Sequence, residues 1–133
     1  MSLSDPIANF LTSVQNASRA LKPQVDVPAS RLSQGIAECL KQEGFIQNWR
    51  FLKEGSSQGV LRIYLKYTAD RKPILQHVRR ISRPGRRIYV RKTNVPRILS
   101  GIGMAILSTP GGVVSDAQAR ASGTGGEMIC HVW

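Results

Sequence analysis

A short segment rich in hydroxyl groups and glycine, Ser108-Thr109-Pro110-Gly111-Gly112, is the first candidate for a ligand contact. Two adjacent hydroxyls beside two glycines allow side-chain oxygens and backbone amides to approach a ligand closely. Suitable ligand groups are a phosphate, a ribose 2′-hydroxyl or the edge of a base. The segment is not a Walker loop, because no Gly-Lys-Ser/Thr follows it. An ordinary tight turn is the alternative interpretation.

A tyrosine inside a run of basic residues is the second candidate. Strand alternation would place Arg87, Tyr89 and Arg91 on one face. An exposed aromatic ring flanked by guanidinium groups is suited to stacking on an unpaired base. We therefore interpret Tyr89 as a stacking residue, and a tyrosine that only covers a strand edge is the alternative. The basic side chains assigned to the same contact are Arg83, Arg86 and Arg87.

The third candidate is Gly125-Gly126-Glu127, which precedes the last predicted strand. The two glycines permit close backbone contact. The Glu127 carboxylate can accept hydrogen bonds from the exocyclic amines of bases or hold a basic neighbour. A structural turn with a local ion pair is the alternative for this motif.

Residues for catalysis or metal binding are poorly represented. His77 and His131 are isolated, and neither forms a ligand spacing with Cys39 or Cys130. The basic half of the chain holds only three acids, which predicts no metal-binding carboxylate cluster. We therefore expect no enzyme activity, no metal and no cofactor, with structural histidines and two buried, reduced cysteines.

The charge distribution indicates the ligand class. Between Arg71 and Arg97 the chain has ten Lys or Arg residues and no acid, interleaved with apolar residues. The formal net charge is +11, of which residues 69–133 carry +8. A folded surface with one sign of charge binds a polyanion, and nucleic acid phosphate is favoured. An RNA-processing enzyme with the same basic surface is the alternative.

A membrane partner is disfavoured. No apolar run is long enough to cross a bilayer. A surface-bound helix would place its basic residues opposite a broad apolar face, whereas the basic residues of this chain lie mainly on strand-like segments.

The periodicity of residues 1–68 predicts a helix–strand–helix–strand–strand unit. Asp5 and Pro6 are typical of the start of a helix, and Ser30 of the cap of the next one. Gly44 fits the left-handed position that ends this second helix. The expected elements are a helix over 6–20, a strand over 25–27, a helix after Ser30, and strands over 45–53 and 60–67 around a turn at 55–59.

Residues 69–133 predict a mainly β domain with one short helix. The expected strands cover 75–82, 87–92, 104–108 and 127–133, with Arg83-Pro84-Gly85 as a turn between the first two. Ser115 and Gln118 form a capping box that starts the short helix, which ends before Gly123. The expected fold class is α+β, with two small packed domains over 1–68 and 69–133.

Several motifs in a fixed order resemble a known family. They are Asp5-Pro6-Ile7-Ala8, Asn16, Val27-Pro28-Ala29-Ser30, Glu43-Gly44-Phe45-Ile46, residues 80–89, Gly101-Ile102-Gly103, residues 105–109 and Gly125-Gly126-Glu127. Over nearly the whole chain these motifs resemble the bacterial-type eighth protein of the small ribosomal subunit.

The resemblance implies two small packed α+β domains, of which the second binds an irregular helix in the central domain of small-subunit rRNA. Members of this family act early in subunit assembly, and in some bacteria they repress translation of their own operon. The Ser108-Thr109 loop would touch the RNA, with Tyr89 and Glu127 beside it. Asn16 and Ser30 would offer backbone contacts from the first domain.

The partners implied are small-subunit rRNA, neighbouring small-subunit ribosomal proteins and the messenger of the protein's own operon. We expect a monomer when the protein is free, located on cytoplasmic ribosomes. No transit-like leader rich in Arg and Ser is present, which favours a bacterium, with an organelle-encoded ribosome as the alternative location.

Overall fold

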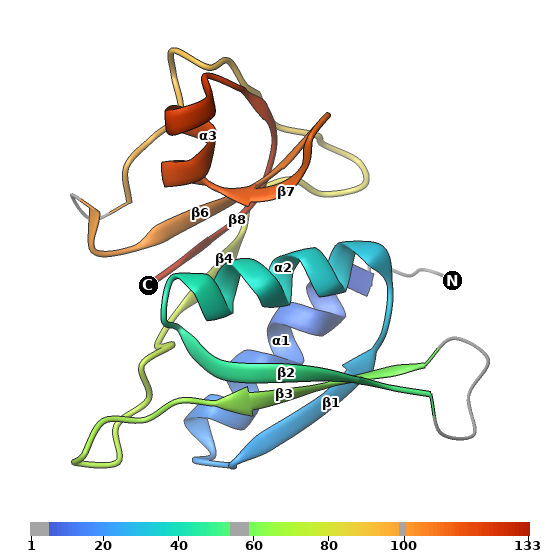
Figure 1. Ribbon diagram of the computed structural model, residues 1–133, viewed down its shortest axis with the longest axis vertical. Helices are drawn as coiled ribbons and strands as arrows, with labels where there is room; N and C mark the ends of the chain where they lie inside the picture. Colours follow the sequence, from blue (N-terminus) through green and yellow to red (C-terminus); the bar gives the residue numbers. More distant parts are fainter. Residues whose placement is uncertain (1–5, 54–58, 99–100) are drawn as a thin grey trace. The chain divides into compact units, whose positions relative to one another are not determined.

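The computed structural model describes residues 6–53, 59–98 and 101–133. The described chain forms two compact units, Pro6–Gln76 and His77–Trp133, which contain both helices and antiparallel sheets (Figure 1). The expected α+β fold class is therefore confirmed. The predicted elements fall in the predicted order in both units, with one strand added in the second.

The division between the units lies after Gln76, whereas the sequence suggested one at 68–69. The intervening segment stays with the first unit through specific hydrogen bonds. The Ile74 amide donates to the Lys66 carbonyl at 3.1 Å, and the Ser18 hydroxyl donates to the Leu75 carbonyl at 3.0 Å. The Leu75 side chain is also buried, so this polar segment belongs to the first core.

The first unit is a three-stranded antiparallel sheet with two helices. Its elements are α1 (Pro6–Arg19), β1 (Gln24–Pro28), α2 (Arg31–Gln42), β2 (Ile46–Leu52) and β3 (Val60–Leu65). The strand order is β1-β3-β2, and α1 and α2 contact these strands. On β3 the inward residues Leu61, Ile63 and Leu65 are buried, as the alternation predicts.

Local signals set the helix ends in this unit. Pro6 begins α1, as expected, while Asp5 lies outside the described residues, as do residues 54–58 of the expected turn. Ser30 caps α2 in a capping box with Ser33. After α2, Gly44 has a φ of 81°, and the Phe45 amide donates to the Leu40 carbonyl at 2.8 Å. This hydrogen bond and the left-handed glycine form a Schellman motif.

The second unit is a five-stranded sheet built around the strand that comes last in sequence. Its elements are β4 (Val78–Arg80), β5 (Tyr89–Val90), β6 (Met104–Thr109), β7 (Gly112–Ser115), α3 (Asp116–Ser122) and β8 (Gly126–Val132). β8 pairs with β4, β5 and β6, and β7 pairs with β6, all antiparallel. Ser115 and Gln118 form the predicted capping box of α3, and Gly123, with a φ of 68°, ends it.

Two expectations for this sheet are corrected. Strands expected over 75–82 and 87–92 shorten to β4 and β5, which pair with β8 and not with each other. The buried Ser82 side chain replaces part of the backbone pairing, because its hydroxyl accepts from the Ile88 amide at 2.7 Å. The sequence also missed β7, since its four residues begin within the glycine-rich segment that was interpreted as a loop.

Candidate nucleic-acid interface

Three of the predicted site residues lie in one line across the second sheet. Tyr89 on β5 is paired with Glu127 on β8, and Glu127 is paired with Ser108 on β6. Residues directly opposite each other in antiparallel strands project from the same face of the sheet. We call Tyr89, Glu127 and Ser108 the cross-strand row. The sheet thus brings together side chains that are up to 38 positions apart in sequence.

The residues next to the row in sequence face the other way. Leu107 packs with Ala105 and with Ala119 of α3, and the half-buried Val90 and Val114 pack against this cluster. The Tyr89 side chain is 68% exposed. The ring is therefore open to solvent on the side of the sheet opposite the cluster, as stacking on a base requires.

An ion pair fixes the carboxylate at the centre of the row. Arg87 Nη1 lies 2.9 Å from Glu127 Oε2 and donates a hydrogen bond to it. Glu127 is mostly shielded, with 18% of its side chain exposed, while 52% of the Arg87 side chain is exposed. The guanidinium is thus held next to the row and remains accessible to a phosphate.

The two adjacent hydroxyls have different roles. Thr109 Oγ1 donates to the Gly112 carbonyl at 2.8 Å and accepts from the Gly111 amide at 3.2 Å. These bonds hold the tight turn at Pro110 and Gly111 between β6 and β7. The Ser108 hydroxyl makes no hydrogen bond to another described residue and is half-buried in the row. Thr109 therefore maintains the turn, and Ser108 is the hydroxyl available to a ligand.

The glycines before Glu127 allow neighbouring strands to approach β8. A Cβ on Gly125 would lie 2.3 Å from the Val90 carbonyl oxygen, and one on Gly126 would lie 2.2 Å from the Ser108 carbonyl oxygen. Any larger residue would push β5 or β6 away. Gly126 thus sets the spacing of the cross-strand row.

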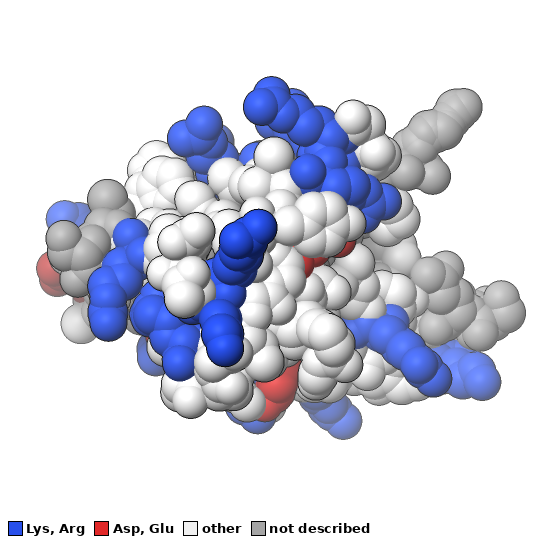
Figure 2. Space-filling model, turned by 90° about the horizontal axis from the view of Figure 1, so that it is seen from above, with Lys and Arg blue, Asp and Glu red and all other residues white. Residues whose placement is uncertain are grey.

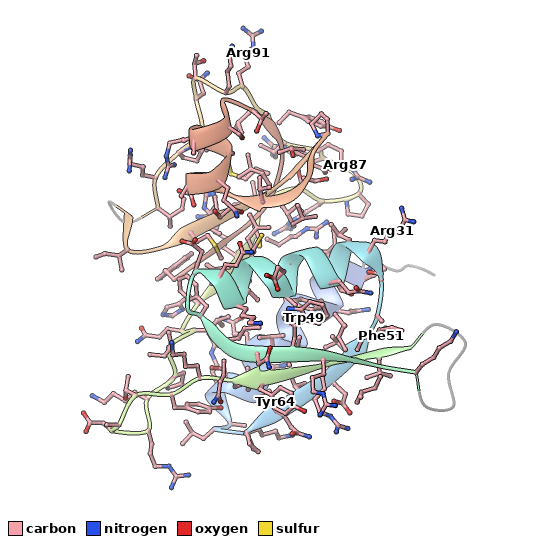
Figure 3. All side chains as sticks on the ribbon, in the orientation of Figure 1. Arg31, Trp49, Phe51, Tyr64, Arg87 and Arg91 are labelled. Atoms are coloured by element: carbon pink, nitrogen blue, oxygen red, sulfur yellow. The ribbon has the colours of Figure 1, made fainter. Side chains whose placement is uncertain are left out.

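The basic side chains of the second unit lie on several different segments. Arg83 and Arg86 are exposed at the turn over Pro84 and Gly85, closed by a backbone bridge between the two arginines. Figure 2 shows Lys and Arg side chains in separate groups on the visible face, with uncharged surface between them. In Figure 3, Arg87 and Arg91 project from different parts of the second unit. The expected common face of Arg87, Tyr89 and Arg91 does not extend to Arg91, because β5 ends at Val90.

Comparison with known proteins identifies the family. A sequence model of the family described as ribosomal protein S8 matches residues 5–133. The chain belongs to the ribosomal protein S8 family.

Relatives in this family are similar over their whole length. The chain is 48% identical to a protein of Desulforamulus reducens, with all of both chains aligned. It is 50% identical to one of Thermosipho africanus over 98% of each chain. It is 45% identical to one of Moorella thermoacetica over 98% of this chain and all of the relative. Each of the three relatives is named small ribosomal subunit protein uS8.

Ribosomal protein S8 is a structural component of the ribosome and not an enzyme. The alternative of an RNA-processing enzyme is therefore wrong. In the part of the chain that is described, no group of three or more His, Cys, Asp or Glu residues could hold a metal ion. No described helix is both long and apolar enough to span a membrane.

In this S8 chain a buried carboxylate that sequence reasoning missed supports the sheet of the interface. Asp116 Oδ1 accepts from the Ala105 amide at 3.2 Å, and Asp116 Oδ2 lies 2.8 Å from Arg120 Nη1. Arg120 also donates to the Pro96 carbonyl at 2.9 Å. Together these bonds tie α3 to β6 and to the irregular segment before it. The signal in the sequence is the Asp and Arg four residues apart at the start of a helix.

The histidines and cysteines of this S8 chain have structural surroundings. The His77 ring stacks on Trp133 with 5.4 Å between ring centroids, and His131 Nε2 lies 2.9 Å from Met128 Sδ. Cys39 and Cys130 are both buried and reduced, as expected. Burial raises the pKa of the Cys39 thiol to about 12, which keeps it protonated and unreactive.

The two predicted S8 contacts of the first unit differ in availability. Asn16 is exposed on α1. The Ser30 hydroxyl accepts from the Ser33 amide at 3.0 Å and lies 3.1 Å from Ser33 Oγ. The Ser30 amide also donates to Ser33 Oγ at 2.8 Å, and the Ser30 carbonyl accepts from the Gln34 amide at 3.0 Å. The polar groups of Ser30 are therefore used by the helix cap, although the residue is exposed.

Proposed function

We propose that this chain is a primary rRNA-binding protein, which binds an irregular helix in the central domain of small-subunit rRNA and helps to assemble the subunit. The observation that carries the proposal is the cross-strand row, in which an aromatic ring, a carboxylate and an open hydroxyl face the same way. Family membership and the net charge of +11 support it.

Each part of the interface has a distinct role in this proposal. Phosphates would be neutralised by the exposed guanidiniums of Arg83, Arg86 and Arg87, which position the RNA without reading its sequence. Tyr89 would stack on an unpaired base, and Ser108 would bond a ribose hydroxyl or a base edge. Glu127, oriented by Arg87, would accept from an exocyclic amine.

The wider setting follows from the same assignment. The proposed partners are small-subunit rRNA and neighbouring small-subunit ribosomal proteins, with the messenger of the protein's own operon as a second RNA target. We propose that the free protein is a monomer and that it works on ribosomes of a bacterial cytoplasm.

The difference between the two hydroxyls provides the test. Hydroxyl-radical footprinting on naked small-subunit rRNA should show one short protected helix. Ser108→Ala should weaken binding to that helix by about fivefold, the equivalent of one hydrogen bond of about 1 kcal/mol, and leave binding to unrelated RNA unchanged. Ser122→Ala, on α3, is the matched control and should bind normally.

A second variant separates the hydroxyl contact from the turn. Thr109→Ala should lower the free energy of unfolding, because it removes both side-chain bonds of the turn. Equal losses on cognate and unrelated RNA for Ser108→Ala, or a footprint spread over many helices, would contradict the proposal.

A further inference from the structure

A shallow apolar hollow lies on the first unit, between the loop that follows α1 and the loop that follows β3. It is lined by Leu21 and Pro23 from the first loop and by Tyr67 and Arg71 from the second, with a volume of about 300 Å³. This is space enough for one large side chain or one nucleobase. None of these residues belongs to the cross-strand row, which lies in the second unit.

Leu21 occupies a position that normally takes glycine. It follows the end of α1 with a φ of 58°, while its amide donates to the Ser18 carbonyl at 3.1 Å and the Lys22 amide donates to the Ala17 carbonyl at 3.0 Å. This is the left-handed residue of a Schellman motif, where glycine is preferred because a side chain is strained. The Leu21 side chain is also 46% exposed. Helix termination alone therefore does not explain a leucine here.

Arg71 occupies a second position of the same kind. The Arg71 amide donates to the Thr68 carbonyl at 2.9 Å, and the Thr68 amide donates to the Lys72 carbonyl at 2.9 Å. A turn followed by a left-handed residue is the usual three-residue loop between paired strands, and glycine suits its last position. Arg71 holds that position with a φ of 62°. Among the described residues other than glycine, only Leu21 and Arg71 have positive φ, and both line the hollow.

The chemistry of the hollow indicates its occupant. The Tyr67 hydroxyl donates to the Lys22 carbonyl, which fixes the ring and uses its polar end within the protein. The lining is therefore mainly apolar, and Arg71 adds a cation to it. Arg19 at the end of α1, and Lys22 and Lys72 in the two loops, add positive charge to these segments beside a single acid, Asp70. An apolar lining that contains an aromatic ring and one cation, on two basic segments of the chain, suits a base joined to its phosphate.

We propose that this hollow binds one unpaired nucleotide of RNA, with the base against Leu21, Pro23 and Tyr67 and its phosphate on Arg71. The inference rests on the proposed RNA-binding function and adds a second contact, in the first unit. Because the lining offers the base edge almost no hydrogen-bonding group, the contact accepts any base.

Glycine variants separate this binding from folding. Leu21→Gly and Arg71→Gly each relieve a left-handed side chain, so the urea midpoint of unfolding should stay equal or rise. Each should weaken binding of the full chain to small-subunit rRNA by about fivefold or more: Leu21→Gly through the lost base contact, for which this is the lower bound, and Arg71→Gly through the lost phosphate contact. Lys41→Ala, an exposed residue of α2, removes one positive charge elsewhere and should weaken binding less than Arg71→Gly.

Ultraviolet crosslinking of the wild-type complex provides the direct readout. A nucleotide should be found attached to the peptide that contains Tyr67, and Leu21→Gly should abolish that adduct while adducts at Tyr89 persist. If the glycine variants bind rRNA like the wild type and the Tyr67 peptide carries no nucleotide, the inference is overturned. The same result would follow if the hollow bound an acidic peptide instead.

The two proposals fail in different ways. Normal binding by the glycine variants together with weak binding by Tyr89→Ala would leave the cross-strand row as the RNA site and reject the hollow. A wild-type protein that protects no single rRNA helix in the footprint, and binds unrelated RNA equally well, would reject the proposed function itself.

Discussion

At the scale of single residues, the cross-strand row combines one exposed group with groups that the fold holds in place. Tyr89 is 68% exposed and contributes little to the core, so the structure gives it no strong role in folding. Glu127 is held by Arg87. This arrangement lets the contribution of Tyr89 to binding be measured without disturbing the sheet.

Tyr89→Ala should reduce the free energy of binding to the cognate rRNA helix by ~1–3 kcal/mol, the range for a base stacked on an aromatic ring. The free energy of unfolding should change by less than about 0.5 kcal/mol, since the ring is at the surface. Filter binding and urea denaturation measure the two quantities. Tyr89→Phe keeps the ring and should bind like the wild type; if Tyr89→Ala also binds normally, stacking is refuted.

His131 should make the second unit sensitive to mild acid. Burial, and secondly the positive charge of Arg79, lower the pKa of this imidazole below its ordinary 6.5, although Asp116 opposes the shift. The unfolded chain then binds the proton more readily than the folded one. The free energy of unfolding should therefore be highest above about pH 6.5 and fall as the pH drops toward the folded-state pKa.

Urea titrations between about pH 5 and pH 8 measure this dependence. His131→Gln should flatten it, because glutamine does not titrate in this range. A His131→Gln curve that runs parallel to the wild type would show that another group controls the pH response.

At the scale of elements, α3 depends on a buried charge. Asp116 has 5% of its side chain exposed and links the start of α3 to β6 and to Arg120. Its removal would leave a guanidinium and a backbone amide without their acceptor in a largely buried place. The stability of the sheet that carries the row therefore depends on a helix that packs on the sheet's other face.

Asp116→Ala should lower the free energy of unfolding by ~3 kcal/mol, near the lower end for breaking a buried pair because Arg120 remains partly exposed. Asp26→Ala is the matched control. It breaks the Asp26–Arg62 pair, which is exposed, and should cost about 0–1 kcal/mol. Urea denaturation measures both variants. An equal loss of unfolding free energy in the two would show that the buried Asp116 bonds stabilise the protein no more than the exposed Asp26–Arg62 pair does.

At the scale of the whole molecule, charge should govern affinity. If five or six phosphates are neutralised, the logarithm of the affinity should fall with the logarithm of salt concentration at a slope of about −4 to −5. A fluorescence titration with the cognate helix at several salt concentrations measures this slope. Arg83→Ala should make it shallower by about 1, whereas Tyr89→Ala should leave it unchanged; a slope near zero for the wild type would remove phosphate attraction from the mechanism.

The sequence could predict the parts of this molecule that depend on neighbouring residues. The ends of α2 and α3 follow from Ser30, Gly44 and Ser115, which act within one helical turn. The lengths of β4 and β5 could not be predicted, because both depend on pairing with β8, which lies 36 to 54 positions later in the sequence. β7 was missed for a related reason: it has only four residues, and its strand conformation depends on pairing with β6.

The candidate interface shows the same limit. Ser108, Tyr89 and Glu127 were each selected by residue type, but only the strand order puts them in one line. Thr109 differs from Ser108 because its hydroxyl bonds to the backbone of the turn. Residue type alone does not reveal this hydrogen bond. Left-handed backbone at Leu21 had no signal in the sequence, since leucine rarely adopts it.

The central position of β8 has a consequence for protein synthesis. The strands β4, β5 and β6 are synthesised before β8, and each of them pairs with β8. The first unit, in contrast, is complete by residue 76. A nascent chain can therefore fold its first unit early but cannot assemble the cross-strand row until residue 132 has left the ribosome. Under the proposed function, unfinished copies of the protein would then be unable to bind the rRNA helix.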